Sequence, residues 1–262
     1  MPKIALLAPA KIKANLNTKR IGRKILIYNS ISSTNDIAAE YAMDIKNDGL
    51  VIFAEEQTAG RGRAGAKWTT GRADSILCSI VLAENKCGAE MLSLASAVAV
   101  AEAIGTSTGT QAKIKWPNDI ILNNRKVAGI LLESKQTDGW IFYIAGIGIN
   151  CHQKKDSFPD ELKDIATSID IESGITCDRI SLAKRLLVSM EYWLKTAQKS
   201  SKKVTEQWRK LSIQLGHRVK LIYNGKEFAG NCIGVDPQKG LVLQLDTGGV
   251  RMFDAAHTTI AK

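Results

Sequence analysis

The segment from residue 112 to residue 150 is the feature that most constrains the fold. It contains four apolar stretches of strand length with no helical pattern between them: AKIKW, DIILN, KVAGILLES and WIFYIAGIGIN. Asn123-Asn124-Arg125 and Asp138-Gly139 separate neighbouring stretches and are typical of turns. Because helices do not alternate regularly with these strands, a mixed sheet backed by a few helices fits better than a doubly wound sheet. We therefore predict an α+β fold.

The first 212 residues contain further strands and the main helices. Apolar runs typical of strands lie at 25–29, 50–56 and 75–84. Ser33, Thr34 and Asn35 are residue types that cap helices, and an apolar stripe at helical spacing follows them. Helical patterns also cover 89–105, which we expect to end at Gly105, and then 179–199 and 202–211.

The sequence changes character after residue 212. Short apolar stretches follow one another, and Asn224-Gly225, Asp236-Pro237 and Gly248-Gly249 mark their turns. Asn-Gly is a strong signal for a type I′ hairpin. We predict three parts: a basic N-terminal extension at 1–24, a larger domain at 25–212 and a small C-terminal β-barrel at 213–262.

The formal net charge of +10 suggests a nucleic-acid binder until the charge is located. Seven Lys and Arg residues and no Asp or Glu fall within residues 1–24, so the rest of the chain is only mildly basic. We expect these residues to form a solvated tail. A weak nucleic-acid arm and an organelle-targeting address are the alternatives.

Composition also limits the class of protein. No apolar run approaches the ~18 residues of a membrane-spanning helix, and Pro9 interrupts the short apolar run near the start, so we expect neither a membrane span nor secretion. The five cysteines are scattered and never spaced C-x-x-C, which favours reduced thiols and a cytoplasmic location. The three histidines lie far apart, so we expect no His-based metal site or Ser-His-Asp triad.

A basic, glycine-rich loop at 55–74 is the clearest candidate for a functional segment. Its centre, residues 60–65, fits the pattern G-x-G-x-x-G, but it does not follow a strand directly or open a helix, which disfavours a dinucleotide site. The Walker A pattern also fails, because Ala66 precedes Lys67 and Trp68 replaces the magnesium-binding hydroxyl. A mobile surface loop with solvated arginines and an RG-rich nucleic-acid segment stay open as alternatives.

Three further stretches present polar residues or glycines near strand ends. KIKWPND stops a strand at its proline and presents Asn118 and Asp119, NRKVAGILLES places Lys126 before an apolar strand, and IAGIGIN ends at Asn150. Taken together and in order, these motifs make residues 25–262 closely resemble the biotin–protein ligase family. The motifs that carry the resemblance are SSTN (32–35), EEQTAGRGRAGAKW (55–68), KWPND (115–119), RKVAGIL (125–131) and GIGIN (146–150).

The resemblance implies a fold and a reaction. The fold would be a mixed sheet related to the catalytic domain of class II aminoacyl-tRNA synthetases, followed by an SH3-like barrel. The activity would be that of an ATP-dependent ligase, which converts biotin and MgATP to biotinyl-5′-AMP and pyrophosphate. The adenylate would then acylate one lysine of a biotin carboxyl carrier domain, as in acetyl-CoA or pyruvate carboxylase. Mg²⁺ would be held mainly through phosphate oxygens, with no protein ligand assigned.

This chemistry explains the residue types. The biotin carboxylate must attack the α-phosphate of ATP, so cations are needed to relieve the repulsion between two anions. The resemblance implies that Lys126 and Arg63 are catalytic, and Asp119 is our candidate to accept or orient the proton of the acceptor lysine, with turn capping as its alternative role. A flexible loop that closes over the adenylate would exclude water. The residues implied for biotin are Ser33, Thr34, Asn35, Gln57, Gly60, Arg61, Gly62, Arg63, Lys126 and Gly129. Those implied for ATP and the adenylate are Arg61, Arg63, Lys67, Trp68, Lys115, Asn118, Lys126, Gly146 and Asn150.

The chain departs from the family pattern at several positions. Ala64 and Ala66 stand where relatives commonly carry arginine, and Ile233 replaces an arginine of some relatives, so we assign no site residue to the C-terminal domain. The leader is too short for the winged helix-turn-helix of repressor-type members, so we expect a short form that binds no specific DNA; a homodimer is left open. The alternatives are a lipoate or octanoate ligase or transferase of the same fold, a non-catalytic biotin sensor and a basic RNA-binding protein.

Overall fold

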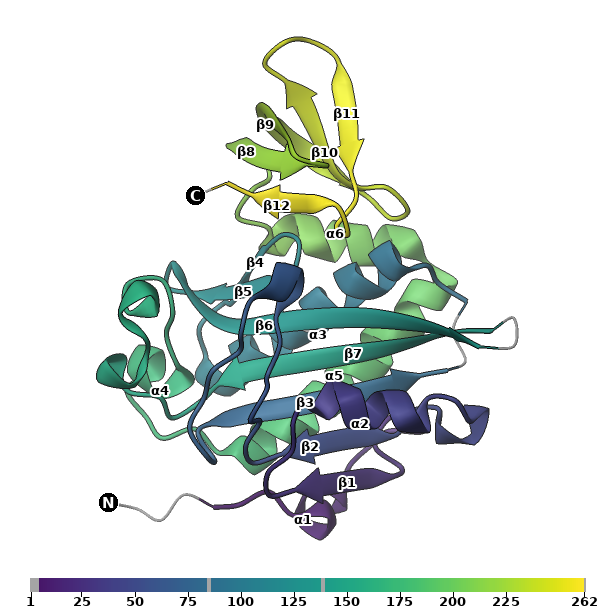
Figure 1. Cartoon of the computed structure of the whole chain (residues 1–262), viewed down its shortest axis with the longest axis vertical. Coiled ribbons are helices and arrows are strands. Elements are labelled where there is room, and N and C mark those ends of the chain that lie inside the picture. The colour runs from purple at the N-terminus through teal and green to yellow at the C-terminus, as the bar shows by residue number, and fades with distance from the viewer. Residues whose placement is uncertain (1–4, 84–85, 138–139, 262) are drawn as a thin grey trace.

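The computed structural model describes residues 5–83, 86–137 and 140–261, which form a large mixed-sheet domain and a smaller sheet domain above it (Figure 1). The larger sheet has seven strands in the order β1-β2-β3-β7-β6-β5-β4. β1 pairs with β2 in parallel, and the other described pairings of this sheet are antiparallel. The strands are β1 (Ile25–Tyr28), β2 (Val51–Ala54), β3 (Ser75–Leu82), β4 (Lys113–Lys115), β5 (Asp119–Leu122), β6 (Arg125–Thr137) and β7 (Trp140–Asn150). The predicted α+β class and mixed sheet are confirmed.

Helices cover both faces of this sheet. α3 (Ala89–Thr108) and α5 (Arg179–Lys199) lie behind it, and α2 (Thr34–Tyr41) lies in front (Figure 1). α6 (Ser201–Leu211) leads from α5 towards the smaller domain. By length and composition α3 could cross a membrane, although we expected no such helix from the sequence. In the folded protein, however, 67% of its most apolar stretch is buried. Such burial is the environment of a core helix that packs between a sheet and another helix.

Two turns and one helix end can be compared with the predictions. Asn123 and Asn124 adopt φ of 47° and 65°, so the predicted turn between β5 and β6 is confirmed. The Asp138-Gly139 turn lies outside the described residues. The prediction that the alanine-rich helix ends at Gly105 is wrong: α3 continues to Thr108 and stops at Gly109, where φ is 70° and the N–H donates to the Gly105 carbonyl. A left-handed residue ends a helix, whereas a glycine with helical torsions costs only about 1 kcal/mol inside one.

The N-terminal segment is packed against the larger domain. Residues 9–13 form the short helix α1 (Pro9–Lys13), and the side chains of Ile12 and Ile21 are fully buried in the core. The backbone N–H groups of Lys19, Arg20 and Ile21 donate to the carboxylate of Glu191 on α5, at 2.6–2.9 Å. The expectation of a solvated tail is therefore wrong for the described residues, because their apolar side chains and backbone amides find partners while most lysines face water.

The smaller domain is an antiparallel sheet of five strands in the order β11-β10-β9-β8-β12. The β8–β9 turn has φ of 49° at Asn224 and 76° at Gly225, which confirms the predicted type I′ hairpin. A closed barrel is not present among the described pairings, because β11 and β12 stand at opposite ends of the order. The strands are β8 (Arg218–Tyr223), β9 (Lys226–Asp236), β10 (Gly240–Leu245), β11 (Val250–Phe253) and β12 (Thr258–Ile260). β12 is the strand that faces the larger domain (Figure 1).

Candidate active site

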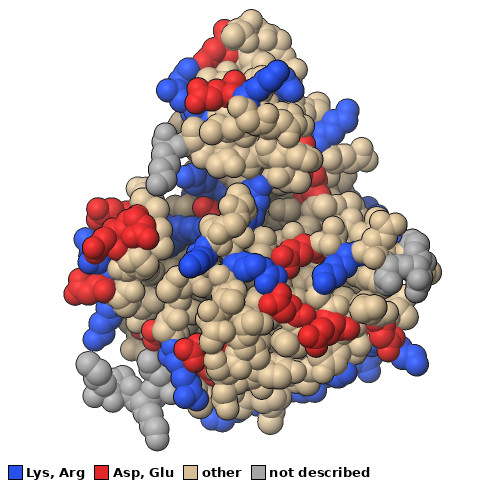
Figure 2. Space-filling view, viewed as in Figure 1, with Lys and Arg blue, Asp and Glu red and all other residues tan. Residues whose placement is uncertain are grey.

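A cavity of about 270 Å³ lies between the larger sheet, the glycine-rich loop and β12. Lys and Arg side chains gather around this hollow beneath the smaller domain (Figure 2). Segments far apart in the sequence meet here: the start of α2, the loop at 57–68, the β4–β5 connection, β6, β7 and β12. Basic side chains above an apolar floor are suited to a ligand that combines an apolar part with phosphate.

The floor of the cavity is made of glycines on two neighbouring strands. Gly129 on β6 pairs with Gly148 on β7, and Leu131 pairs with Gly146. The indole of Trp68 lies directly on this floor: a methyl group added at Gly148 would come within 2.5 Å of its Cε2 atom. Among the described residues, the buried Trp68 Nε1 has no hydrogen-bond acceptor. The glycines thus let the loop's one aromatic side chain approach the sheet closely.

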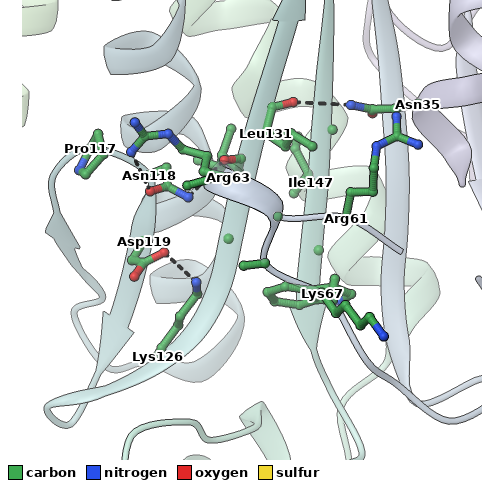
Figure 3. A pocket seen from close by; sticks show the side chains of 18 of the residues that line it. Asn35, Arg61, Arg63, Lys67, Pro117, Asn118, Asp119, Lys126, Leu131 and Ile147 are labelled. Carbon is green, nitrogen blue, oxygen red and sulfur yellow. Dashed lines mark hydrogen bonds and ion pairs between the residues drawn. The ribbon is translucent and has the colours of Figure 1, made fainter. Parts of the chain in front are cut away.

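An ion pair marks one end of the cavity. The ammonium Nζ of Lys126 lies 2.6 Å from a carboxylate oxygen of Asp119 (Figure 3). The same Nζ lies 5.7 Å from the centre of the Trp68 ring, within the range of a cation–π interaction. Asp119 begins β5 and Lys126 lies near the start of β6, so the tight Asn123-Asn124 turn between these strands brings the two side chains together. The ammonium of Lys126 thus lies beside the apolar floor, with its charge balanced by Asp119.

The two loop arginines point to opposite ends of the cavity (Figure 3). Arg63 donates from NH1 to the amide oxygen of Asn118 at 3.4 Å, and from NH2 to the backbone carbonyls of Thr258, at 3.1 Å, and Ala255. Burial lowers the pKa of the Arg63 guanidinium, and the nearby carboxylates of Asp119 and Glu90 act in the opposite direction. Arg63 is therefore a half-buried cation whose hydrogen-bond partners are neutral oxygens.

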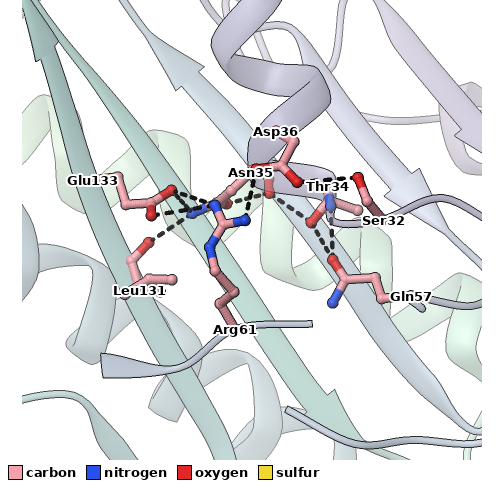
Figure 4. A network of polar contacts seen from close by, with 9 residues as sticks. Ser32, Thr34, Asn35, Asp36, Gln57, Arg61, Leu131 and Glu133 are labelled. Carbon is pink, nitrogen blue, oxygen red and sulfur yellow. Dashed lines mark hydrogen bonds and ion pairs between the residues drawn. The ribbon is translucent and has the colours of Figure 1, made fainter. Parts of the chain in front are cut away.

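Arg61 lies in a different electrostatic environment (Figure 4). Its guanidinium forms ion pairs with Asp36 of α2 at 2.7 Å and Glu133 of β6 at 3.3 Å. The hydrogen bond to Asp36 raises the pKa of Arg61. Asn35 extends the network, because its Nδ2 donates to Glu133 at 2.7 Å and its Oδ1 accepts from Ser79 at 2.5 Å. Two carboxylates compensate the charge of Arg61 and anchor the loop to α2 and β6.

The start of α2 is capped in a way the sequence did not indicate. The N-cap residue Ser33 makes no side-chain cap hydrogen bond. Instead, Oε1 of Gln57 accepts from both the backbone N–H of Thr34, at 2.7 Å, and its hydroxyl, at 2.9 Å (Figure 4). The amide of Gln57 therefore satisfies an N-terminal donor of the helix from the neighbouring loop.

Comparisons with known proteins agree with this geometry. Residues 27–150 match the biotin/lipoate A/B protein ligase family. The chain is 32% identical over 253 residues to the bifunctional ligase/repressor BirA of Bacillus spizizenii, which covers 95% of this chain and 78% of that relative. The chain belongs to the biotin–protein ligase family. It is also 31% identical to the biotin–(acetyl-CoA-carboxylase) ligase of Mycobacterium tuberculosis, over 87% of this chain and 85% of that relative.

The fold of this family member also matches solved ligases. The biotin protein ligase from Aquifex aeolicus in complex with biotin and ATP superimposes with a TM-score of 0.78 and 26% identity, over 92% of this chain and 99% of that one. The biotin protein ligase from Leishmania major in complex with biotinyl-5-AMP superimposes with a TM-score of 0.59 at 21% identity, which shows the shared fold alone.

Most residues predicted for the ligase site meet in this one cavity. The structure brings together Ser33, Thr34, Asn35, Gln57, Arg61, Gly62, Arg63, Lys67, Trp68, Lys115, Asn118, Asp119, Lys126, Gly129 and Gly146. Gly60 and Asn150 are not among the lining residues. A side chain at Gly60 would collide with the Trp68 carbonyl, and the amide of Asn150 is bound to the Thr167 carbonyl and to Gln153. Both support the residues that line the cavity.

Sequence reasoning missed several residues that line or support this cavity. Thr258, Thr259 and Ile260 of β12 line the cavity, although we had assigned no site residue to the C-terminal domain. The carboxylates of Asp36 and Glu133, which hold Arg61, were also missed. A strong signal was present for Asp36, which lies beside the SSTN motif, but no local pattern connects β12 with a loop almost two hundred residues earlier.

Proposed function

We propose that this chain is a biotin–protein ligase that activates biotin with ATP and transfers it to a lysine of a carrier protein. One observation carries the proposal: the half-buried Arg63, whose hydrogen bonds go to neutral oxygens, and the Lys126–Asp119 pair flank an apolar glycine floor under a loop that also supplies Trp68. Biotin has an apolar body and a carboxylate, and ATP supplies the phosphate to be attacked. The cavity offers a surface of matching chemistry to each of these parts.

In the activation step, the biotin carboxylate oxygen attacks the α-phosphorus of ATP. A bond from that oxygen to phosphorus forms, and the bond from phosphorus to the pyrophosphate oxygen breaks. Lys126 and Arg63 stabilise the negative charge on the transferred phosphoryl group, because both cations are held in place before the substrates arrive. Arg61 does a different task in this proposal: it anchors the loop through Asp36 and Glu133.

Biotin occupies the apolar part of the cavity. Its fused rings and chain lie against Ile130, Ile147 and Leu77, and the indole of Trp68 covers them. Its ureido group faces the polar start of α2, where the Thr34 hydroxyl and Gln57 amide are already linked by hydrogen bonds. The closed loop keeps water from the mixed anhydride, which would otherwise hydrolyse.

In the transfer step, the neutral amine of the carrier lysine attacks the acyl carbon of the adenylate. The carbon–nitrogen bond forms, the bond from the acyl carbon to the phosphate oxygen breaks, and AMP leaves with that electron pair. We assign Asp119 to accept or orient the proton that the lysine loses, because it is the one carboxylate among the described residues that line the cavity.

The described residues also suit a Mg²⁺ that arrives with ATP. No group of three or more His, Cys, Asp or Glu side chains in the described parts of the chain could hold a metal ion, and Asp119 already pairs with Lys126. Mg²⁺ commonly binds through substrate phosphates and keeps several waters, so it needs no protein cage. When bound, it would neutralise phosphate charge beside Lys126 and Arg63.

The partner and the setting extend the proposal. The relatives named as biotin–(acetyl-CoA-carboxylase) ligases support a biotin carboxyl carrier protein as the acceptor. We further propose a cytoplasmic enzyme that binds no specific DNA and no membrane, with the three parts 1–24, 25–212 and 213–262. Gel-shift assays with biotin-operon DNA test the DNA prediction, and light scattering with and without biotin and ATP tests for a homodimer.

The decisive experiment uses biotin, MgATP and a purified carrier domain with wild type and Lys126→Ala. Removal of one transition-state donor costs about 10²–10³ in rate, so we expect biotin-dependent pyrophosphate exchange to fall by that factor. Lys113→Ala, on strand β4 of the same sheet but outside the cavity lining, is the matched control and should retain activity. Full activity in Lys126→Ala would refute the assignment. Exchange that depends on lipoate instead of biotin would favour the alternative ligase.

A further inference from the structure

The turn between β11 and β12 contacts the catalytic loop directly. Its residues Ala255 and Thr258 offer their backbone carbonyls to the guanidinium of Arg63, which reaches them from the opposite domain. The turn is ordered internally by Asp254, whose carboxylate accepts from the Tyr223 hydroxyl at 2.9 Å and the backbone N–H of His257 at 3.0 Å. A rigid turn of the C-terminal domain thus fixes the position of a loop side chain.

Carbonyl acceptors orient Arg63 without cancelling its charge. The three hydrogen bonds from NH1 and NH2 use three of the five N–H groups of a guanidinium, which leaves two donors. Arg61 on the same loop is bound by two carboxylates instead. The hydrogen bonds described for Arg63 go to neutral oxygens, although the carboxylates of Asp119 and Glu90 lie near enough to attract it. A phosphate oxygen placed near its remaining donors therefore gains a charge-assisted interaction.

Helix α3 also binds this turn. The backbone N–H of Ala255 donates to Oε1 of Glu90 at 2.7 Å. Glu90 lies in the first turn of α3, where the helix dipole favours a negative charge. Ala255 therefore connects two groups: its N–H binds Glu90, and its carbonyl binds Arg63. The other oxygen of Glu90, Oε2, is buried and has no hydrogen-bond partner among the described residues, so Ala255 is the principal contact of this carboxylate.

We propose that Glu90 is a positioning residue for ATP: it holds Ala255 so that the turn presents its carbonyls to Arg63. The inference rests on the proposed function, because it takes Arg63 as the phosphate-binding cation. Glu90 does not line the cavity: it holds the turn through Ala255, and its charge also attracts the Arg63 guanidinium. Its loss should therefore weaken nucleotide binding while biotin, which lies at the other end of the cavity, still binds.

The test measures the affinity for α,β-methylene-ATP at saturating biotin, the affinity for biotin, and the melting temperature. Loss of a hydrogen bond worth about 1 kcal/mol corresponds to about fivefold weaker nucleotide binding, which we expect for Glu90→Ala. Glu90→Asp keeps the charge but shortens the reach to Ala255, so it should show the same loss. If Glu90→Ala does not fold, this variant replaces it. Glu90→Gln keeps an acceptor oxygen and should stay within about twofold of wild type.

Glu102 on the same helix provides the control for a purely structural effect. It accepts from Trp193 Nε1 at 2.6 Å and Gln207 Nε2 at 2.9 Å, far along the chain from the turn. Glu102→Ala should lower the melting temperature without changing nucleotide affinity. The same assays in an Arg63→Ala background test whether Glu90 acts through Arg63. If it does, Glu90→Ala should cause no further loss of nucleotide affinity in that background.

Two results would overturn the inference: wild-type nucleotide affinity in both Glu90→Ala and Glu90→Asp, or an equal loss with and without Arg63. The failure of the proposed function has a different signature. Wild-type protein would then show no biotin-dependent pyrophosphate exchange, and this is measured first. If wild type exchanges pyrophosphate and Glu90→Ala binds nucleotide normally, only the inference fails.

Discussion

Gly148→Ala is the substitution whose effect follows most directly from the geometry of the cavity floor. The added methyl group would lie 2.5 Å from Cε2, 2.7 Å from Cζ2 and 2.9 Å from Nε1 of Trp68. Carbon atoms in ordinary contact are about 3.5–4.0 Å apart, so the ring must retreat by about 1 Å. Gly148 lies near the C-terminal end of β7, but it is paired with Leu77 of β3 on one side and Gly129 of β6 on the other, so the strand has little freedom to move instead.

The cost of this collision sets the expected loss of activity. Overpacking by a methyl group costs about 1–3 kcal/mol, and each 1.4 kcal/mol is a factor of about ten, so the corresponding change is about 5- to 150-fold. Trp68 belongs to the loop that covers the cavity, so displacing the ring also displaces the loop from the cavity. We expect the rate of biotin-dependent pyrophosphate exchange to fall within this range, and the melting temperature to change less than it would for a core cavity.

Two further variants make the experiment decisive. In a Trp68→Ala background the added methyl meets no ring, so Gly148→Ala should have little further effect. Gly105→Ala adds the same methyl inside α3, where the nearest atom outside the helix is 3.4 Å away, and should retain the exchange rate while stabilising the protein by about 0.5–1 kcal/mol. Wild-type exchange by Gly148→Ala, or an equal loss with and without the indole, would refute the argument.

Two other predictions concern stability. Glu55 and Arg179 form an ion pair with both side chains 1% exposed, so Glu55→Ala should lower the free energy of unfolding in urea by about 3–5 kcal/mol. Glu206→Ala, in an exposed pair with Lys202, should change it by less than about 1 kcal/mol, and equal effects would contradict the role of burial. Burial tends to raise the pKa of Glu191, but the backbone N–H groups of Lys19, Arg20 and Ile21 outweigh it and lower that pKa. A lowered folded pKa adds stability above the unfolded pKa, and this stability is lost as pH falls through the folded pKa. Glu191→Gln should therefore be less stable than wild type at pH 7, with the difference lost as pH falls through the lowered pKa of Glu191.

Local sequence signals predicted the elements well where one residue type enforces a backbone conformation. Asn224-Gly225 and Asn123-Asn124 adopt the left-handed torsions that these residues tolerate, and both turns are where the sequence indicated. The long amphipathic helix at 179–199 is confirmed with the same bounds. The predicted C-terminal end of α3 was wrong because Gly105 and Gly109 are both compatible with a helix end. Only the left-handed torsions at Gly109 show which of the two ends the helix.

The candidate site was predictable as a set of residues but not as an arrangement. The motifs identified the loop, Lys126 and the glycines of β6 and β7, which all meet in the cavity. They singled out Arg63 as catalytic, but they did not show the different environments of Arg61 and Arg63, which are only two positions apart in the sequence. Carboxylates from α2 and β6 compensate one, and carbonyls from the C-terminal domain hold the other.

The sequence by itself therefore determined most strands and helices, the positions of the turns, the family, and the types of reactive residue. These follow from periodicity, from the torsions of Gly, Asn and Pro, and from motifs that each occupy a few neighbouring residues. Only the tertiary structure decided that Leu7, Ile12 and Ile21 pack into the core and that β12 lines the cavity. It also decided that Arg63 is hydrogen-bonded to neutral oxygens while Arg61 pairs with carboxylates. Each of these depends on the free energy of a contact between residues distant in the sequence, and burial and electrostatic compensation exist only once the chain has brought those residues together.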